Sequence, residues 1–397
     1  MRKVGIIAEY NPFHSGHAAQ IAALRQMGAQ SVAVVLGGNF VQRGSPALFS
    51  KFLRARAALA CGADLIAELP VPWAAAEADQ FAEGGVFLLA AAGCDAICFG
   101  AEQPDLDRLR QLAALLEDPA FDAALTAHHI AGGGSLASLR AHLAEQEIPG
   151  AAKLLAGPNN ALGIAYLRAI RRLGLDLQAI VIPRIGAGHD MPLGKGKIAS
   201  AGALRGLFYE KGAAALAPYL PECCLPLYLA AERAGAVADP AAFSLSLLTL
   251  LRAADPAGFA ALPGAGGEGL DHLLAKAAAQ AGSAEELYGL LKSKRYTHAR
   301  VRRLALAAYL GLRGDLPRLP PYLRLLGGSA AGLREIPGRA AGIKIPVSQS
   351  LARLRRAGGD AGRVASLEAR AGALWNLCLR IPRPASAEFT EKFLRVE

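Results

Sequence analysis

The sequence predicts a doubly wound parallel α/β sheet followed by a basic, mainly helical region. Short apolar runs, partly β-branched, alternate with helical stretches through the first half of the chain, as in sheets built from strand–helix–strand crossovers. Polar and glycine-containing turns follow most of these runs, at the strand ends where such sheets bind ligands. Beyond about Tyr209 the strand pattern disappears and positive charge accumulates.

Local patterns place each expected element. Short apolar runs predict strands at Val4–Ala8, Val32–Leu36, Asp64–Ala67, Ala96–Phe99 and Ala179–Ile182. Residues 105–146 have a helical pattern with a glycine-rich break at residues 132–134, so we expect a helical insertion beside the sheet. Helices separated by Pro/Gly linkers are expected after Tyr209, with one short extended stretch at residues 342–346.

Net charge divides the chain into two parts. Because 397 residues exceed one typical core, we expect two or three domains, and the patterns along the chain define two. These are a catalytic domain over residues 1–210, with the insertion at about 105–150, and a mainly helical domain over residues 211–397. Residues 1–210 carry 18 basic and 18 acidic side chains, whereas residues 287–397 carry 21 and 7. A region of one sign predicts a polyanionic partner such as RNA or DNA.

Composition also excludes several classes of protein. The apolar runs stop far short of the roughly 20 residues that a membrane span requires, and the first residues lack a signal-peptide pattern. We therefore expect a cytoplasmic protein without membrane association, and no protein partner is evident. The six cysteines form no C-x-x-C pair and no zinc-spaced cluster with histidine, so reduced thiols and no metal site are expected.

Two histidines lie where the first expected strand turns into a helix. His14 and His17 fall in the first turn of a helix that the spacing of Ile21, Leu24 and Met27 predicts. Free N–H groups and the helix dipole favour a phosphate at this turn. Neither G-x-G-x-x-G nor G-x-x-x-x-G-K-[ST] occupies it. The two histidines are therefore expected to contact the phosphate in place of a glycine-rich loop. The alternative is that the pair consists of two ordinary surface residues, as an isolated pair of this kind often does.

This H-x-G-H turn resembles that of the nucleotidyltransferase superfamily, whose members adenylate or cytidylylate their substrates. There the imidazoles stabilise charge on the triphosphate as pyrophosphate leaves. The superfamily has a second element, a Ser/Thr-rich turn with an arginine at a helix start, which holds the β and γ phosphates. Residues 197–205 match the spacing of this element. Ser200 and Arg205 are the expected residue types, but Gly202 stands where a threonine is common. A plain helix N-cap is the alternative role of Ser200.

Longer motifs, in order along nearly the whole chain, resemble the bacterial tRNA(Met) cytidine acetate ligase family. They are GIIAEYNPFHSGH (residues 5–17), GGNFVQRGSPA (37–47), GADLIAELP (62–70), FGAE (99–102), GPNNALG (157–163) and KRYT (294–297). The resemblance implies a Rossmann-like sheet of the nucleotidyltransferase type and a ligase that activates acetate with ATP as acetyl-adenylate. The acetyl group would pass to N4 of the wobble cytidine of elongator tRNA(Met), giving N4-acetylcytidine. Mg²⁺ is expected to bind with ATP, although no dedicated carboxylate cage is visible.

The same resemblance assigns the site residues. The catalytic residues would be His14, His17, Ser200 and Arg205. The ATP site would consist of Ile7, Ala8, Glu9, Tyr10, Asn11, Pro12, Phe13, His14, Ser15, Gly16, His17, Ala18, Ala19, Gln20, Gly100, Asn159 and Arg184. A helix cap is the alternative for Asn159, and a surface ion pair is the alternative for Arg184.

Further polar residues follow the expected strands. We suggest that one group shapes the acetate pocket or meets the target cytidine, namely Asn39, Gln42, Arg43 and Lys51. Asp64 and Glu68 flank the third strand, where either residue can be structural. His189 and Asp190 form either a supporting pair or a loop turn.

A basic block near residue 300 is expected to bind tRNA phosphates. It consists of Lys292, Lys294, Arg295, Arg300, Arg302 and Arg303, with Tyr296 and His298 interleaved. No acidic residue of the block balances these charges, which favours salt-dependent contacts to an RNA backbone. Tyr296 can stack on an unpaired base or pack in a helix interface.

Two other functions stay open at this point. A small-metabolite adenylyltransferase would leave the basic second half unexplained, and its activity would be indifferent to tRNA. A non-catalytic RNA-binding protein on a nucleotide fold would bind ATP without releasing pyrophosphate. Gly202 is the only sequence feature that supports this last alternative.

Overall fold

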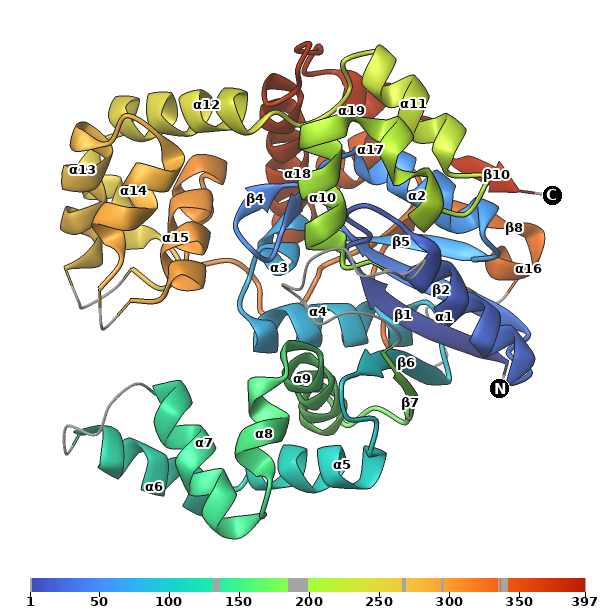
Figure 1. Ribbon diagram of the computed structural model, residues 1–397, viewed down its shortest axis with the longest axis vertical. Coiled ribbons are helices and arrows are strands. Elements are labelled where there is room, and N and C mark those ends of the chain that lie inside the picture. The colour runs from blue at the N-terminus through green and yellow to red at the C-terminus, as the bar shows by residue number, and fades with distance from the viewer. Residues whose placement is uncertain are drawn as a thin grey trace.

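A mostly parallel, eight-stranded sheet lies at the centre of the computed structural model (Figure 1), in the order β10-β8-β5-β2-β1-β6-β7 with β9 beside β8. The structure describes residues 2–130, 136–184, 199–265, 269–293, 296–334, 336 and 342–396. Every strand expected in the first half is confirmed. They are β1 (Lys3–Ala8), β2 (Ser31–Gly37), β5 (Leu65–Leu69), β6 (Ala96–Ala101) and β7 (Gln178–Pro183).

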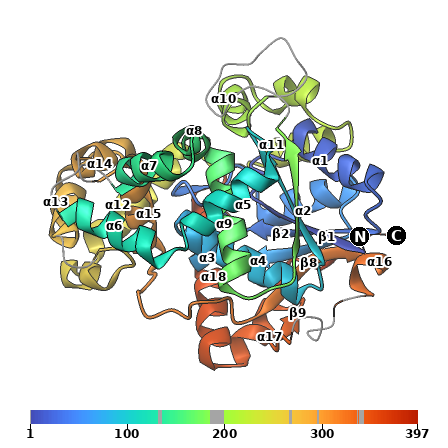
Figure 2. The same cartoon turned by 90° about the horizontal axis from the view of Figure 1, so that it is seen from below.

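Both faces of the sheet are buried, which explains why its central strands are continuously apolar. In β2, Val34 and Val35 point to opposite faces and belong to different apolar clusters. One face is covered by α1 (Ser15–Gln26) and α2 (Lys51–Ala60), and the other by α4 (Ala78–Ala91), α9 (Pro158–Arg172) and α18 (Gly359–Leu377), as Figure 2 shows. Because β5, β2, β1, β6 and β7 are parallel, their carboxyl ends lie at the same end of the sheet, where ligands bind in such folds.

The expected helical insertion follows β6. It consists of α5 (Leu106–Leu115), α6 (Pro119–Ile130), α7 (Leu136–Glu147) and α8 (Ala151–Ala156). The glycine-rich break at residues 132–134 lies outside the described residues. Between β2 and α2, the chain forms a short hairpin of β3 (Phe40–Val41) and β4 (Ser45–Pro46). The short helix α3 (Val71–Ala74) precedes α4.

Helices dominate the chain after β7. The first are α10 (Ala201–Lys211), the 3-10 helix η1 (Ala213–Tyr219) and α11 (Leu225–Arg233). A separate group with its own apolar cluster follows, beside the sheet in Figure 1. It comprises α12 (Pro240–Ala253), η2 (Pro256–Ala261), α13 (Leu270–Gln280), α14 (Ala284–Leu291) and α15 (His298–Leu310).

The expectation that strands end near Tyr209 is wrong. The chain returns to the central sheet through β8 (Leu323–Ser329), which runs antiparallel to β5, and through β10 (Leu394–Val396). The extended stretch expected at residues 342–346 directly precedes the short strand β9 (Val347–Ser348). The intervening helices are α16 (Ala330–Leu333), α17 (Leu351–Arg356), α18 and α19 (Ala387–Thr390). The sheet thus contains segments from both sides of the boundary expected at residue 210.

None of the helices in the described part of the chain combines the length and apolar character that a bilayer crossing needs.

Candidate nucleotide-binding site

Both histidines of the first turn cap helix α1 through their Nδ1 atoms. Nδ1 of His14 accepts the backbone N–H of Gly16 at 3.0 Å, and Nδ1 of His17 accepts the N–H of His14 at 3.3 Å. In a neutral imidazole whose Nδ1 accepts a hydrogen bond, the proton resides on Nε2. The two rings stack with their centroids 3.8 Å apart. This turn therefore presents two N–H donors of fixed tautomer side by side.

Burial keeps both imidazoles neutral near pH 7. Desolvation, followed by the charge of Arg184, lowers the pKa of His14 to about 4. Burial also holds the pKa of His17 well below its ordinary value, with further contributions from His14 and Arg184. A neutral imidazole can donate its Nε2–H to an anion without first gaining a proton, and a bound anion would raise the pKa of the ring.

The histidines line a cavity of about 530 Å³ at the carboxyl ends of β1, β6 and β7, a volume typical of small-molecule sites. Most of the expected ATP-site residues line it, together with Arg205: Ile7, Ala8, Glu9, Tyr10, Asn11, His14, Gly16, His17, Ala19, Gln20, Gly100, Asn159 and Arg184. Five of the expected catalytic and ATP-site residues are absent from its lining: Pro12, Phe13, Ser15, Ala18 and Ser200.

Residues outside the lining hold the histidine turn in place. Phe13 is fully buried, and its carbonyl accepts the hydroxyl of Tyr228 at 2.9 Å. The hydroxyl of Ser15 donates to the carbonyl of Tyr219 at 2.8 Å. Ser200 is buried, and its Oγ accepts a backbone N–H as the N-cap of α10. The turn is thus anchored to α11 and η1, far downstream in sequence.

Three arginines make the cavity suitable for an anion. Arg43, Arg184 and Arg205 line it from the β3–β4 turn, the end of β7 and α10. Nη1 of Arg205 donates to the carbonyl of Asn11 at 2.7 Å. Glu9 is the only acidic residue among the described residues of the lining, and burial raises its pKa. The described part of the lining therefore contains no carboxylate cage for a divalent cation.

Gly100 and Asn159 also line the cavity. A Cβ atom on Gly100 would meet no heavy atom within 4 Å, so a ligand can approach the backbone there. Asn159 lies at the start of α9, and its Nδ2 donates to Glu102. Glu102 also accepts the backbone N–H groups of Asn159 at 3.1 Å and Asn160 at 2.8 Å. Glu102, within the F-G-A-E motif, is therefore the helix cap that sequence reasoning did not assign.

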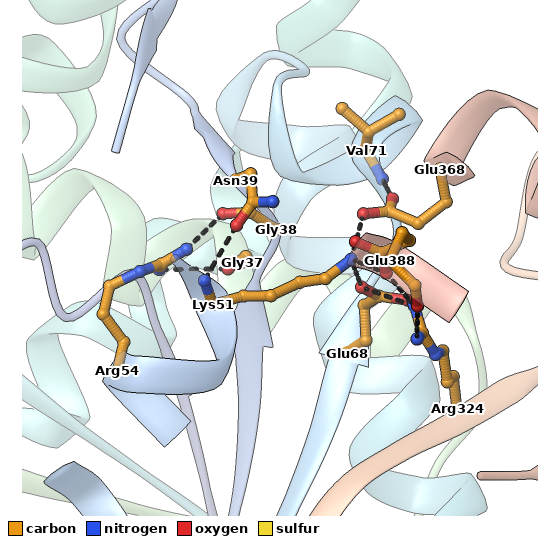
Figure 3. A network of polar contacts seen from close by, with 10 residues as sticks. All are labelled: Gly37, Gly38, Asn39, Lys51, Arg54, Glu68, Val71, Arg324, Glu368 and Glu388. Carbon is orange, nitrogen blue, oxygen red and sulfur yellow. Dashed lines mark hydrogen bonds and ion pairs between the residues drawn. The ribbon is translucent and has the colours of Figure 1, made fainter. Parts of the chain in front are cut away.

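The role expected for Lys51 in a substrate pocket is wrong. Its side chain is 0% exposed and reaches into a cluster of three carboxylates (Figure 3), where Nζ pairs with Glu68 and lies 2.7 Å from Glu368 and 2.6 Å from Glu388. Arg324 of β8 completes the cluster by pairing with Glu68 and Glu388. Burial disfavours the ammonium, but the three carboxylates together raise the pKa of Lys51 above its ordinary value.

The remaining loop residues divide between structure and site. Oδ1 of Asn39 accepts the backbone N–H of Lys51 at 2.8 Å, so Asn39 holds the start of α2. Gln42 lines the cavity together with Arg43. Asp64 accepts the N–H of Val32 at 2.7 Å and is structural, as is Glu68 in its ion-pair cluster.

Arg54 is a buried residue that the sequence pattern did not single out. Its guanidinium donates to the carbonyls of Glu9, Gly37 and Gly38, at the carboxyl ends of β1 and β2. Figure 3 shows Arg54 beside Gly37 and Gly38. Burial lowers the pKa of Arg54 to about 10, and Glu9 opposes that shift. Arg54 fixes the strand ends from which the cavity is built.

The structure corrects two expectations about the basic block. Tyr296 is only 6% exposed and packs in the apolar cluster of the helical group, so it is not placed to stack on a base. Acidic partners do exist, but they come from other elements: Arg302 pairs with Glu285 at 2.9 Å and Arg303 with Glu77 at 3.4 Å. Lys292 is exposed after α14.

Several expected residues cannot be placed. Lys294 and Arg295 of the basic block, His189 and Asp190 lie outside the described residues, as do the first two positions of the 197–205 element.

A second cavity, of about 1010 Å³, opens beside the first. It is lined by the β3–β4 hairpin and helices α10, α12, α14 and α15, and it shares Ser45 and Arg205 with the first cavity. Arg252 and Arg302 also line it. The hairpin tip packs directly on α15: Gly44 has a φ of +80°, and a Cβ there would lie 2.7 Å from the backbone of Arg302.

Together the open parallel sheet, the histidine pair at the end of its first strand and the arginine-lined cavity define an α/β protein of the nucleotidyltransferase class. The sequence profile of the family described as HIGH Nucleotidyl Transferase matches residues 1–388. The tRNA(Met) cytidine acetate ligase of Syntrophotalea carbinolica is 38% identical over 89% of this chain and 86% of its own length. That of Caldanaerobacter subterraneus subsp. tengcongensis is 36% identical, over 85% and 86%. The chain therefore belongs to the tRNA(Met) cytidine acetate ligase family, as the motifs predict.

Solved structures agree with this assignment. The crystal structure of Thermotoga maritima TmcAL bound with alpha-thio ATP is 27% identical to this chain and has a TM-score of 0.89. The apo form of the same protein has a TM-score of 0.90. Both cover 100% of this chain and of their own.

Proposed function

We propose that this protein forms acetyl-adenylate from ATP and acetate and transfers the acetyl group to N4 of the wobble cytidine of elongator tRNA(Met). The observation that carries the proposal is the pair of Nε2–H donors of His14 and His17 in an arginine-lined cavity. Family membership supports the substrate assignment, since the relatives are named for acetate and tRNA(Met). The ATP analogue bound by Thermotoga maritima TmcAL supports the nucleotide.

In the first half-reaction, a carboxylate oxygen of acetate attacks the α-phosphorus and pyrophosphate leaves. Negative charge then moves onto the departing phosphate oxygens. The imidazole N–H groups of His14 and His17 and the guanidinium groups of Arg184 and Arg205 would stabilise this charge, because preformed donors need little reorganisation. Mg²⁺ would bind mainly through the phosphates, and Glu9 is the one carboxylate that the described part of the lining offers.

In the second half-reaction, the N4 amine of cytidine attacks the acetyl carbonyl carbon. The bond between that carbon and the AMP oxygen breaks, AMP leaves, and the amine loses one proton to solvent. No covalent enzyme intermediate is needed. Cys98 is the only cysteine among the described lining residues, and burial raises its pKa to about 11, so it remains a thiol.

The second cavity offers a route for the RNA. It adjoins the acetyl-adenylate site through Ser45 and Arg205 and carries Arg252 and Arg302 on its walls. Lys292 and Arg300 lie on the same helical group. Backbone phosphates near the target cytidine would contact these cations, which supply affinity without base choice.

The decisive experiment is incubation of tRNA with the protein, ATP and labelled acetate, followed by nucleoside analysis. Label is expected in N4-acetylcytidine only when ATP is present. ATP–pyrophosphate exchange without any transfer to tRNA would favour a small-metabolite adenylyltransferase. Binding of ATP without pyrophosphate release would favour a non-catalytic RNA-binding protein.

A further inference from the structure

Three cysteines that are far apart in sequence meet at one point of the surface. Cys61 ends helix α2, and Cys223 and Cys224 directly precede α11. The Sγ atom of Cys61 lies 3.3 Å from that of Cys223 and 3.8 Å from that of Cys224. The two adjacent cysteines have their Sγ atoms 3.9 Å apart. Sequence spacing predicts no metal site because more than 160 residues separate the first cysteine from the others; the fold supplies the proximity.

We propose that Cys61, Cys223 and Cys224 bind one thiophilic d¹⁰ cation, Zn²⁺ or Cu⁺, as three thiolates. In a tetrahedral thiolate site with metal–sulfur bonds of about 2.3 Å, the sulfur atoms lie roughly 3.8 Å apart. Two of the three observed separations match this value, and the third needs a shift of only a few tenths of an ångström. Thiolate ligands select these cations over Mg²⁺ and Ca²⁺.

The surroundings suit a bound cation. Cys223 is exposed, Cys61 is partly buried and Cys224 is buried, so an ion can enter from solvent and keep a water as a fourth ligand.

The other close group of possible ligands does not compete. Glu68, Glu368 and Glu388 also converge, but Lys51 and Arg324 already occupy the space between their oxygens. The cysteine cluster contains no such internal cation among the described residues.

A metal ion at this point would join two segments that shape the active site. Helix α2 contributes Arg54, which holds the ends of β1 and β2. Helix α11 contributes Tyr228, whose hydroxyl holds the histidine turn and whose ring stacks on Phe49 with centroids 4.3 Å apart. Metal binding is therefore expected to raise the melting temperature of the protein.

The test is metal titration of the reduced, full-length protein under anaerobic conditions. Co²⁺ serves as a spectroscopic probe, because three thiolates give it intense sulfur-to-metal charge-transfer absorption and tetrahedral visible bands. Zn²⁺ is then added in competition with the bound Co²⁺, and Cu⁺ is titrated against a chromogenic chelator. One equivalent of Zn²⁺ or Cu⁺ is expected to bind per protein chain.

Variants assign the ligands. Cys223→Ser and Cys61→Ser are expected to lower the affinity at least ten-fold, whereas Cys94→Ala, a buried thiol outside the cluster, keeps one equivalent. Because Cys223 is exposed, its substitution should leave the metal-free melting temperature unchanged, and Cys223→Ala serves as a second variant. The proposal is overturned if the wild type binds less than one equivalent of Zn²⁺ and also less than one equivalent of Cu⁺. It is equally overturned if both Cys223 variants bind the cation as the wild type does, or if freshly purified protein carries a Cys61–Cys223 disulfide. Acetate-dependent ATP–pyrophosphate exchange is measured in parallel, so failure of this proposal is distinguishable from failure of the proposed function.

Discussion

Replacement of Lys51 by methionine is expected to lower the free energy of unfolding by about 3–5 kcal/mol, the cost of removing one partner from a buried charge network. Methionine keeps the length and apolar stem of lysine but removes the ammonium. That ammonium pairs with Glu68 and lies 2.7 Å from Glu368 and 2.6 Å from Glu388, with no exposure to solvent. Without it, three buried carboxylates would face Arg324 alone.

Protonation can relieve part of this cost. Burial, followed by the charge of Glu68, raises the pKa of Glu368 to about 7 even when Lys51 is present. Loss of Lys51 should raise it further, so the penalty should be larger at pH 8 than at pH 6. Addition of Glu68→Gln to Lys51→Met restores the net charge of the wild-type cluster and is expected to recover part of the lost stability.

Urea denaturation followed by tryptophan fluorescence measures this effect. The only two tryptophans, Trp73 and Trp375, are buried, and Trp73 lies beside Val71, whose N–H donates to Glu368 at 2.8 Å. Lys211→Met is the matched control: its side chain is 61% exposed, so a change within about 0.5 kcal/mol is expected. A Lys51→Met protein within 1 kcal/mol of this control, on the scale of surface ion pairs, would refute the reasoning.

Three further predictions concern the active site and the RNA surface. His17→Ala should lower acetate-dependent ATP–pyrophosphate exchange by about 10²–10³-fold, because it removes a donor to the developing phosphate charge. The control His128→Ala, at an exposed histidine, should match the wild type. Unchanged exchange in His17→Ala would show that His17 does not have this role. In the folded protein the pKa of His14 lies near 4, below the ordinary value of 6.5. The neutral ring therefore contributes fully to the free energy of unfolding above pH 6.5. As the pH falls toward 4, this contribution is lost, and the free energy of unfolding decreases by up to about 3 kcal/mol. His14→Asn, which keeps an N-cap acceptor, should flatten that pH dependence in urea unfolding, and an identical slope would contradict the pKa shift. Lys292→Ala should weaken tRNA binding and reduce the slope of log affinity against log salt concentration by about 1, without changing ATP–pyrophosphate exchange. Lys153→Ala on α8 is the control. An unchanged slope in Lys292→Ala would exclude a phosphate contact at Lys292.

The sheet of the first half could be predicted because burial on both faces leaves a strong signal. Strands such as Val32–Leu36 are continuously apolar, and the histidine turn follows the first of them directly. Strand β8 escaped prediction for a physical reason. Arg324 and two glycines interrupt its apolar run, and Arg324 is compatible with a buried strand only because Glu68 and Glu388 arrive from elsewhere in the chain.

Sequence position also leaves side-chain direction undetermined. Gln42, Arg43 and Lys51 follow the same strand, yet the first two line the cavity and Lys51 points into the protein. Tyr296 was equally ambiguous among its basic neighbours, because the apolar cluster that covers it is assembled from α12 to α15. The cysteine cluster has the same origin, since its members meet only when α11 packs against α2.

The two halves of the proposed reaction are joined by rigid contacts. Arg205 lines both cavities and donates to the carbonyl of Asn11 beside the histidines. The hairpin tip at Gly44 packs on α15, and the Lys51 cluster ties α18, α19 and β8 to β5 and α2. In the proposed reaction, acetyl-adenylate would form in the smaller cavity and would meet the RNA base where the two cavities adjoin. Direct transfer of this kind would protect an easily hydrolysed intermediate, and it would explain why the helical group that lines the larger cavity packs against the hairpin beside the smaller one.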